Sequence, residues 1–445
     1  MMGKYPRIRV TPPGPKARAL LKRDAEVMSD SLVRFYPLVV ESGEGSIVRD
    51  VDGNEYIDFN AGIACLNVGH SHPKVVDAIK KQADKFLHYS ITDFYYENIV
   101  SLGEKLQSIT PGNFRKKIFF SNSGAESIET AIKLTRWHTR RPLFLAFIGA
   151  FHGRLMGSLS LTASKPSQKK YFSPLMPGVT HVPYPYCYRC PFKLEYSDCD
   201  YWCVEFIEKW ILERSVPVQD TAAIFFEPIQ GEGGYVVPPP DYFQRLKKLA
   251  DKHEILLVDD EIQAGMGRTG KWSAIEHWNI EPDVTCMAKS LAAGLPIGAT
   301  IAREDIMDWE GGSHTSTFGG NPVSAAAANA AIDAIKDEKL MENATRLGAH
   351  MMSRLKEWQT KYEIVGDVRG KGLMIGIEIV KDKTSKNPGN EESKEIMHKA
   401  WRRGVAVITC GQSTIRIAPP LTITTELVDS ALEILEGAIK EVSTA

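Results

Sequence analysis

The chain has 445 residues, of which 43% are hydrophobic and 24% charged, as is usual for a globular protein. This length exceeds that of one compact domain, so we expect two structural units. Because 54 lysine and arginine residues nearly balance 55 aspartate and glutamate residues, no excess charge is available to attract nucleic acid or an anionic membrane surface.

The N-terminal segment MMGKYPRIRVTPPGPK is charged and rich in proline, and it lacks the apolar run of a secretory signal. No stretch of the sequence reaches the apolar length that spans a bilayer. We therefore expect a cytoplasmic protein with no nucleic-acid or membrane partner.

Residues 35–60 predict two or three antiparallel strands. The stretch VVESGEGSIVRDVDGNEYIDF alternates apolar and polar positions and contains a G-x-G turn and a D-G turn.

Short apolar runs and amphipathic helical patterns alternate after this segment, which predicts an α/β domain with a mainly parallel sheet. The predicted strands are KKIFFSNS (116–123), PLFLAFIGAFHG (142–153), TAAIFFEP (221–228), HEILLVDDE (253–261) and PDVTCMAKS (282–290). Each run ends in polar or glycine residues. Ligands bind outside the carboxyl ends of the strands in such sheets, so we expect the functional residues there.

The first strand end has a sequence that can bind phosphate. Ser123 and Glu126 fit an S-x-x-E capping box, so a helix should begin near Gly124. The free amides of a helix start attract an anion, and Gly124 and Ala125 let it approach the backbone. Taken alone, the motif also fits a simple capped helix.

The second strand end supplies Phe151, His152, Gly153 and Arg154. An aromatic ring in such a loop can stack on a flat heterocycle, and an arginine can bind a carboxylate through two hydrogen bonds. A packed loop with an exposed arginine is the alternative.

Four cysteines gather in one segment: Cys187, Cys190, Cys199 and Cys203. The C-x-x-C pair at its start fits a zinc site of four thiolates or two disulfides, and four reduced thiols in a loop fit it equally well. In each case we expect a structural role, because the cluster has no histidine or carboxylate that could leave a catalytic position open.

The segment LLVDDEIQAGMGRTGK contains the third candidate, Asp260. A buried carboxylate at this position would keep a heterocyclic nitrogen protonated, because opposite charges a few ångströms apart favour the ionised pair. An aspartate that caps a helix is the alternative.

A second interpretation of this segment is a nucleotide-binding P-loop. Gly265, Gly270 and Lys271 match its glycine and lysine positions, but Trp272 stands where the motif requires serine or threonine to hold magnesium. No predicted strand ends immediately before Gly265, so we do not favour this interpretation.

Lys289 follows the apolar run PDVTCMAKS and precedes a glycine-rich turn. An amine in a tight apolar setting has a lowered pKa and can form a Schiff base near neutral pH. A surface lysine is the alternative.

After this region, helices are expected around 322–360, followed by mixed strands and helices and by a solvated loop at 385–392. The two flanking segments predict one small domain that is assembled from both termini. We expect its N-terminal part at 1–70, the large domain at 71–330 and its C-terminal part at 331–445.

Seven motifs together resemble the class III aminotransferases, in this order and over nearly the whole chain: SNSGAE, AFHGR, FFEPIQGEGG, VDDEIQAGMGRTG, MAKSLAAGLPIGA, TSTFGGNP and IRIAPPL. The resemblance implies a fold-type I enzyme that binds pyridoxal 5'-phosphate. It implies a large domain with a mainly parallel seven-stranded sheet and a small α+β domain. It also implies a homodimer, or a tetramer, with the active site at the subunit interface.

The residues that the resemblance implies for the cofactor are Ser123, Gly124, Ala125, Phe151, His152, Asp260, Ile262, Gln263, Lys289 and Thr317. Lys289 is similar to the lysine that forms the Schiff base and moves the proton, and Asp260 to the aspartate that pairs with the pyridinium nitrogen. Gln263 would contact the ring hydroxyl, and Phe151 and Ile262 would enclose the ring.

The phosphate would be bound by the residues from Ser123 to Ala125, together with Thr317 of the neighbouring subunit. The reaction that this implies is a ping-pong cycle between pyridoxal phosphate and pyridoxamine phosphate.

Four further positions bear on the substrate by resemblance. Arg416 is similar to the arginine that binds the α-carboxylate of the acceptor, and Glu227 to the glutamate that masks it when an ω-amine donor binds. Arg154 resembles a second carboxylate-binding arginine. Ile63 matches the apolar position of 4-aminobutyrate aminotransferases, where ornithine aminotransferases have a tyrosine nearby.

We therefore expect transfer from a 4-aminobutyrate-like donor to 2-oxoglutarate, ahead of ornithine or acetylornithine as donors. An amino acid racemase of the same family is the alternative, although no second acid can be assigned from the sequence. A non-catalytic cofactor-binding protein is a third hypothesis, and the presence of the lysine, the aspartate and both arginines gives it no support.

Overall fold

The computed structural model describes residues 5–444 of the chain. The chain divides into two compact units, of which the first is Met1–Pro73 with Glu342–Ala445 and the second is Lys74–Met341. The first four residues of the N-terminal segment, in which we expected no secretory signal, lie outside the described residues.

The boundary between the second unit and the C-terminal segment lies close to the start of α10 (Leu340–Lys361). The boundary expected from the sequence, at 330/331, falls inside helix α9 (Pro322–Asp337). The observed boundaries lie in the first turns of α3 (Pro73–Ala83) and α10, so each of these helices belongs almost entirely to one unit.

A seven-stranded sheet with the order β4-β10-β9-β8-β7-β5-β6 forms the centre of the second unit. The strands are β4 (Lys116–Ser121), β5 (Leu143–Phe147), β6 (Val179–Val182), β7 (Thr221–Phe226), β8 (Leu256–Asp260), β9 (Val284–Met287) and β10 (Gly298–Arg303). Strand β10 is antiparallel to β4 and β9, and the other neighbours are parallel. The predicted fold class is confirmed.

The five predicted strands of this sheet are β4, β5, β7, β8 and β9. All six residues of β7 are buried, because helices cover both faces of such a sheet and its central strands therefore read as continuous apolar runs. Strands β6 and β10 escaped prediction. Their sequences, VTHV and GATIAR, mix polar, small and charged residues with few large apolar ones.

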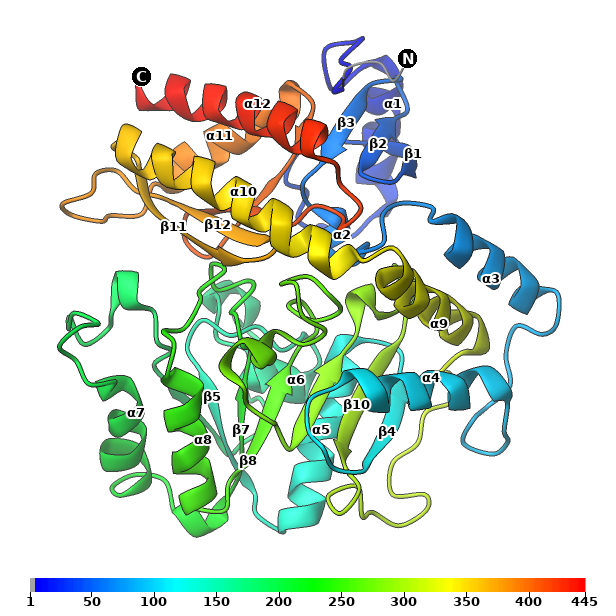
Figure 1. The fold of residues 1–445 in the computed structure, drawn as a ribbon, viewed down its shortest axis with the longest axis vertical. Helices are drawn as coiled ribbons and strands as arrows, with labels where there is room; N and C mark the ends of the chain where they lie inside the picture. Colours follow the sequence, from blue (N-terminus) through cyan, green and yellow to red (C-terminus); the bar gives the residue numbers. More distant parts are fainter. Residues whose placement is uncertain (1–4, 445) are drawn as a thin grey trace. The chain divides into compact units, whose positions relative to one another are not determined.

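The helices around this sheet are α3 (Pro73–Ala83), α4 (Glu97–Ile109), α5 (Gly124–Thr139), α6 (Met156–Leu161), α7 (Trp202–Phe206), α8 (Tyr242–Lys252) and α9. Helices α4 and α9 lie side by side (Figure 1), where Asn329 Nδ2 donates a 2.7 Å hydrogen bond to the carbonyl of Asn98. Among the described residues, no helix is both long and apolar enough to cross a membrane.

The first unit contains two four-stranded sheets with the orders β1-β2-β3-β13 and β11-β12-β15-β14. The strands are β1 (Val40–Glu44), β2 (Ile47–Asp50), β3 (Glu55–Asp58), β11 (Val365–Lys371), β12 (Met374–Ile379), β13 (Val405–Ala406), β14 (Ile408–Cys410) and β15 (Thr414–Ile417). Strands β1, β2 and β3 pair antiparallel, which confirms the strands predicted within residues 35–60.

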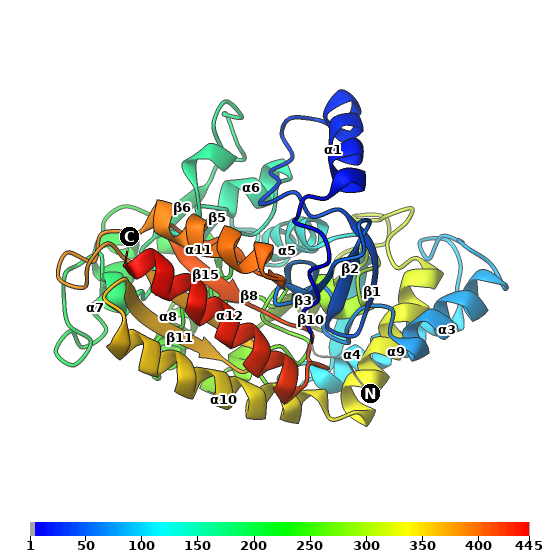
Figure 2. The same cartoon turned by 90° about the horizontal axis from the view of Figure 1, so that it is seen from above.

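The helices of the first unit are α1 (Pro15–Val27), the single turn α2 (Ala61–Ala64), α10, α11 (Asn390–Arg402) and α12 (Thr425–Ser443). Helix α12 lies between α10 and α11 (Figure 2) and forms ion pairs with both, Arg354–Asp429 with α10 and Lys399–Glu441 with α11. The loop expected at 385–392 is shorter than predicted, because α11 already begins at Asn390.

Candidate active site

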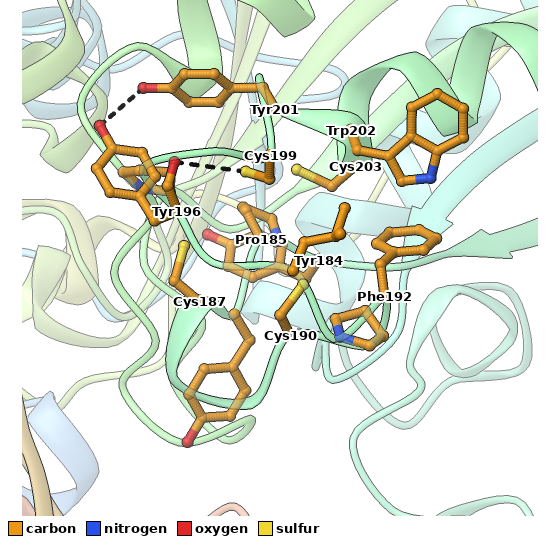
Figure 3. A pocket seen from close by; sticks show the side chains of 14 residues that line it. Tyr184, Pro185, Cys187, Cys190, Phe192, Tyr196, Cys199, Tyr201, Trp202 and Cys203 are labelled. Carbon is orange, nitrogen blue, oxygen red and sulfur yellow. Dashed lines mark hydrogen bonds between the residues drawn. The ribbon is translucent and has the colours of Figure 1, made fainter.

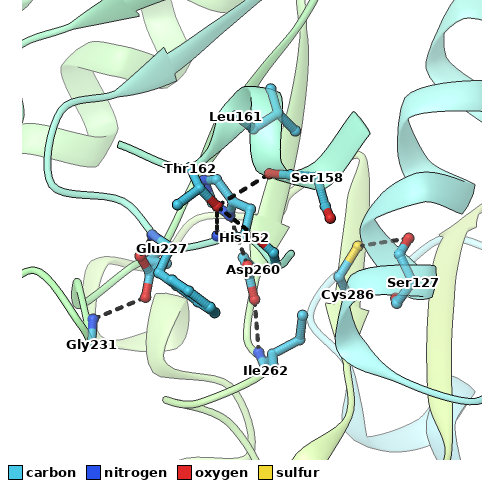
Figure 4. Close-up of polar contacts among 12 residues, drawn as sticks. Ser127, His152, Ser158, Leu161, Thr162, Glu227, Gly231, Asp260, Ile262 and Cys286 are labelled. Carbon is cyan, nitrogen blue, oxygen red and sulfur yellow. Dashed lines mark hydrogen bonds and ion pairs between the residues drawn. The ribbon is translucent and has the colours of Figure 1, made fainter. Parts of the chain in front are cut away.

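Polar side chains gather at the carboxyl ends of three neighbouring strands of the second unit (Figure 4). Asp260 is the last residue of β8, Glu227 follows β7, and His152 lies in the loop after β5. Strands β5, β7 and β8 are adjacent and parallel, so their carboxyl ends lie at one edge of the sheet. These predicted strand ends therefore form one site.

Asp260 is buried, with 3% of its surface exposed, and both of its carboxylate oxygens have partners. Oδ2 lies 2.8 Å from His152 Nδ1, and Oδ1 accepts a 3.0 Å hydrogen bond from the Ile262 amide. The His152 side chain is fully buried, and its backbone amide donates to Thr162 Oγ1 at 2.9 Å. Asp260 is thus a positioned, partnered carboxylate, and the helix-cap alternative does not apply, because no helix begins there.

Glu227 is a second buried carboxyl beside this pair. Its Oε1 accepts a hydrogen bond from the Phe151 amide and its Oε2 one from the Gly231 amide, both at 2.9 Å. Burial and the charge of Asp260 raise the pKa of Glu227 to about 7, although His152 and the two amides act in the opposite direction. This carboxyl therefore titrates near neutral pH.

The raised pKa of Glu227 predicts a pH-dependent stability. Since the folded-state pKa lies above the ordinary value of 4.5, the contribution of this group is fully present below pH 4.5 and is lost as the pH rises through about 7. At about 1.4 kcal/mol per pKa unit, the loss amounts to about 3 kcal/mol.

Urea unfolding at pH 5 and pH 8 measures this loss. Glu227→Gln should reduce the difference in unfolding free energy between the two pH values, whereas Glu391→Gln, at a side chain that is 82% exposed, should leave it unchanged. Equal pH dependence in wild type and Glu227→Gln would contradict the assignment.

The phosphate site predicted at the first strand end has the expected backbone. Ser123 caps α5, and its hydroxyl accepts a 3.2 Å hydrogen bond from the Glu126 amide. The second hydrogen bond of the predicted capping box, from the Ser123 amide to the Glu126 carboxylate, is replaced by another. Glu126 Oε2 accepts a 2.8 Å hydrogen bond from the Asn122 amide. The amides of Gly124 and Ala125 precede the first intrahelical hydrogen bond of this 16-residue helix, from Ser127 to Ser123, and such amides can bind an anion.

Three close approaches at glycines connect the strand ends. A Cβ added at Gly124 would lie 2.9 Å from Ile262 Cδ1, and one added at Gly153 would lie 2.8 Å from the Cβ of Ala125. These glycines bring the helix start against the segment after β8 and against the loop after β5. The start of α5 is therefore contiguous with the Asp260 site.

The third approach involves Gln263. A Cβ at Gly231 would lie 2.6 Å from Gln263 Nε2, so the amide group packs on the loop after β7. Gln263 is buried, and its Oε1 has no hydrogen-bond partner among residues 5–444. A buried acceptor without a partner is costly, so this oxygen is suited to accept a hydrogen bond from a ligand hydroxyl.

Lys289 leaves the sheet at the same edge as Asp260. Asp260 pairs in register with Cys286 of β9, and Lys289 begins the short helical turn that follows this strand. The lysine is half-buried and has a φ of 45°, in the left-handed region that residues other than glycine and asparagine avoid. Strained backbone of this kind clusters at functional sites.

The remaining predicted positions differ in their surroundings. In the second unit, the exposed Arg154 places its guanidinium 5.6 Å from the ring centroid of Phe151. Thr317 is exposed and follows Ser316, whose hydroxyl lies 3.4 Å from Asn122 Nδ2. Its contact across a subunit interface stays a prediction.

Two substrate positions belong to the first unit. Arg416 is buried in β15, with 3% exposed surface, whereas Ile63 lies in the turn α2 and is 43% exposed. Their roles toward a substrate rest on the family resemblance.

Sequence reasoning missed the residues that hold the buried acids. Thr162 binds the His152 amide, and Tyr184 donates hydrogen bonds to the carbonyls of Glu227 at 2.8 Å and Pro228 at 3.1 Å. Neither lies in a predicted motif, and each comes from a segment remote from its partner. His152 was predicted as a cofactor contact, but its pairing with Asp260 had no signal in the sequence.

The P-loop interpretation is wrong. Residues 262–273 form consecutive turns and bends after β8, and no strand ends immediately before Gly265. A P-loop needs a strand that leads into its glycine-rich turn.

The four clustered cysteines line one small cavity, with tyrosine, phenylalanine and proline side chains around them (Figure 3). All four are free thiols. Burial and the neighbouring thiols raise the pKa of Cys187 to about 11 and that of Cys203 to about 12. Within residues 5–444, no group of three or more metal-ligating side chains is arranged to hold a metal ion.

The site as a whole fits pyridoxal phosphate. It combines the capped start of α5 for an anion, a buried carboxylate for a protonated ring nitrogen, a buried acceptor without a partner and a lysine at one edge of the sheet. The apolar side chains of Ile262 and Phe151 belong to the segments after β8 and β5 that meet at this edge. We infer that these residues would bind the cofactor in the roles that the motifs predicted.

Comparisons with known proteins agree with this arrangement. A family model described as aminotransferase class-III matches residues 28–439. The chain is 43% identical to an alanine/serine racemase of Pyrococcus horikoshii, over 99% of this chain and 94% of that protein. It is 38% identical to a 4-aminobutyrate aminotransferase of Mycobacterium leprae, over 95% of each. The structure of a Bacillus anthracis aminotransferase aligns with a TM-score of 0.88 at 30% identity, covering 96% of this chain and 99% of that one.

Proposed function

This chain belongs to the class III aminotransferases, and from this membership we propose that it transfers an amino group from a 4-aminobutyrate-like ω-amino acid to 2-oxoglutarate. The enzymes of this family depend on pyridoxal phosphate. The proposed reaction is a ping-pong cycle in which one product leaves before the acceptor binds. The observation that supports it most is the buried Glu227, which lies next to the Asp260 site.

The chemistry divides between the cofactor and the chain. When bound, pyridoxal phosphate supplies an electron-accepting ring that stabilises the negative charge left on the donor carbon when its proton is removed. Asp260 keeps the ring nitrogen protonated, and His152 orients this carboxylate through the 2.8 Å contact. The start of α5 at Ser123 and Gly124 holds the phosphate.

Lys289 acts twice in the proposed cycle. Its Nζ would hold the cofactor between turnovers, and the freed amine would remove the proton from the donor carbon as a general base and then return it as a general acid. Its position after β9, at the edge where Asp260 lies, supports this assignment.

The proposed reaction uses an acceptor that has an α-carboxylate and a donor that lacks one, so the charge of the substrate site must suit both molecules. By the family resemblance, Arg416 would bind the α-carboxylate of the acceptor, and Glu227 would serve the donor that lacks this carboxylate. Arg154 binds the distant carboxylate. A Glu227 that titrates near pH 7 changes its charge at low energetic cost, which suits this alternation.

An amino acid racemase is a second candidate, favoured by the 43% identity to the alanine/serine racemase over 99% of this chain. A racemase needs a group that returns the proton to the opposite face of the planar intermediate state. Such an enzyme would turn over repeatedly on one amino acid, without an oxoacid acceptor.

The test is a donor panel of 4-aminobutyrate, ornithine, acetylornithine, lysine and alanine with 2-oxoglutarate, read by glutamate formation. We expect the largest kcat/KM for 4-aminobutyrate. In parallel, L-alanine, L-serine and L-leucine without oxoacid are followed by chiral chromatography. Accumulation of D-amino acid over many turnovers, with no glutamate from any donor, would overturn the proposal in favour of the racemase.

A further inference from the structure

The face of β8 that lies opposite to Asp260 carries two further acidic side chains. Asp259 precedes Asp260 on the strand and Glu261 follows it, so both project to this face, because side chains alternate along a strand. They are buried, with 0% and 1% of their surface exposed. Burial of an ionised carboxyl group is costly unless the group is paired or hydrogen-bonded.

The surroundings supply few hydrogen-bond donors to these two groups. No other residue within 5–444 has a donor for Asp259 Oδ1, Asp259 Oδ2 or Glu261 Oε2. Ionised carboxylates only accept hydrogen bonds, so two ionised groups would leave all three oxygens without a partner.

A proton on Asp259 provides the missing donor. Burial raises the pKa of Asp259 first, followed by the charges of Glu261 and Asp260 and by a hydrogen bond to the Glu261 side chain. A hydrogen bond that raises the pKa of an acid is one that the protonated acid donates. The Asp259 hydroxyl therefore donates to the Glu261 carboxyl group.

The charges around Glu261 also favour a proton. Burial raises the pKa of Glu261 to about 8, against two backbone amides that lower it, and the charges of Glu276 and Asp260 act in the same direction as burial. Carboxylates that share a buried site do not both ionise near neutral pH, because their charges repel. Asp259 and Glu261 thus hold at least one proton between them at pH 7.

Glu261 holds both ends of the segment that follows it. Its carbonyl accepts a 3.0 Å hydrogen bond from the Gly265 amide, and its Oε1 accepts a 2.8 Å hydrogen bond from the Ile275 amide. A Cβ added at Gly265 would lie 2.8 Å from the Glu261 carbonyl oxygen, so the chain turns back closely on Glu261. Between these contacts, residues 262–273 form turns and bends without a helix or strand.

The same segment carries two of the residues at the candidate site. Ile262 lies against Gly124 at the start of α5, and Gln263 lies against Gly231 with its Oε1 lacking a partner among residues 5–444. A segment without regular secondary structure has few backbone hydrogen bonds of its own, so its position depends on contacts at its ends. The Glu261 side chain makes one of these contacts.

We propose that Asp259 and Glu261 share a proton and act as positioning residues, which hold the segment 262–273 so that Ile262 and Gln263 face the cofactor. The Asp259 hydroxyl fixes the Glu261 carboxyl group, whose Oε1 then binds the Ile275 amide. The inference rests on the proposed function, because it takes Ile262 and Gln263 as contacts of pyridoxal phosphate.

Infrared spectra of the holoenzyme at pH 9 test the shared proton. At this pH, Glu227 and Glu261, with pKa values of about 7 and 8, are largely ionised, whereas Asp259 keeps its proton. The difference spectrum between wild type and Asp259→Asn should contain the C=O band of one protonated carboxyl group, which shifts in D2O. Asp305→Asn is the control, because a hydrogen bond from Arg303 lowers the pKa of Asp305, and its difference spectrum should lack this band. Absence of the band in the Asp259 spectrum would overturn the inference.

The rate at which the holoenzyme loses its cofactor tests the positioning role. Asp259→Ala should accelerate the loss of the Schiff-base absorbance after dilution about tenfold, which is the usual effect of one hydrogen bond to a charged group. Asp259→Asn should release the cofactor at the wild-type rate, because its amide can still donate to Glu261. The double variant Asp259→Ala/Glu261→Ala should release it no faster than Glu261→Ala alone, since both changes remove the same contact.

Asp283→Ala separates positioning from general destabilisation. Asp283 holds the other end of β8, where its Oδ2 accepts a 2.9 Å hydrogen bond from the Leu257 amide. Its loss should lower the melting temperature without faster cofactor release. Release that follows the melting temperature in all variants, additive effects in the double variant, or no rescue by asparagine would overturn the positioning role. Absence of transamination in wild type would end the proposed function alone, and the infrared band and the release rates would still decide the role of the acid pair.

Discussion

Replacement of Lys289 by alanine is expected to lower the multiple-turnover rate by about 10⁴-fold or more, because both the covalent attachment and the general base are lost. The two neighbouring acids of the described site cannot replace the amine, since Asp260 and Glu227 are carboxyls that already contact His152 and backbone amides. The Schiff-base absorbance should disappear, while the cofactor remains bound through its phosphate and ring contacts.

The measurement combines an absorbance spectrum of the purified holoenzyme with steady-state glutamate formation. Lys271→Ala is the matched control, because this exposed lysine was the central residue of the P-loop interpretation. It should retain wild-type turnover and spectrum. Undiminished turnover in Lys289→Ala would show that another group removes the proton, and the assignment of the base would then be wrong.

The fold was largely predictable because its central strands are long apolar runs. Strand β7 is buried at every position, and such a run has few alternative structures. Strand β10 pairs antiparallel with β4 and β9. Its sequence, GATIAR, contains mostly small residues and therefore lacks the long apolar run that identified the other strands. Its strand character comes from the partners on both sides, which local periodicity does not reveal.

The places of three candidate residues in the fold were predictable, because each comes at the end of an apolar strand run. As expected, Asp260 ends β8, Lys289 follows β9 and Ser123 caps α5, whereas their roles toward a cofactor stay predictions. The contact of Asp260 with His152 was not predictable, because it joins positions that lie far apart in the sequence. A contact between the end of one strand and the loop after another depends on the order of the strands in the sheet, which local sequence patterns do not reveal.

The backbone of the turn α2 was the feature least accessible from the sequence. All four of its residues have positive φ angles, and that of Ile63 contradicts the ordinary preference of isoleucine for extended backbone. Local preference failed there because hydrogen bonds from outside hold the start of the turn, where Asp58 Oδ1 accepts from the amides of Asn60 and Ala61.

Asp260→Asn is expected to lower kcat/KM by about 10³-fold, which corresponds to about 4 kcal/mol of lost transition-state stabilisation. Asparagine keeps the shape of the side chain, and its Oδ1 can still accept from the Ile262 amide. It carries no charge, so the ring nitrogen would lose its proton and the cofactor would accept electrons less readily. Single-turnover conversion of the cofactor by a donor measures the loss directly.

Asp259→Asn is the control, because Asp259 is the preceding residue on β8 and its side chain alternates to the opposite face of the sheet. Burial, followed by the charges of Glu261 and Asp260, raises the pKa of Asp259 well above its usual range. The raised pKa favours the neutral form of this carboxyl, which an amide resembles in charge and shape. We expect kcat/KM within about tenfold of wild type. If Asp259→Asn lowered kcat/KM as much as Asp260→Asn, the loss would come from an amide at the end of β8 in general. The specific role of the Asp260 charge would then be wrong.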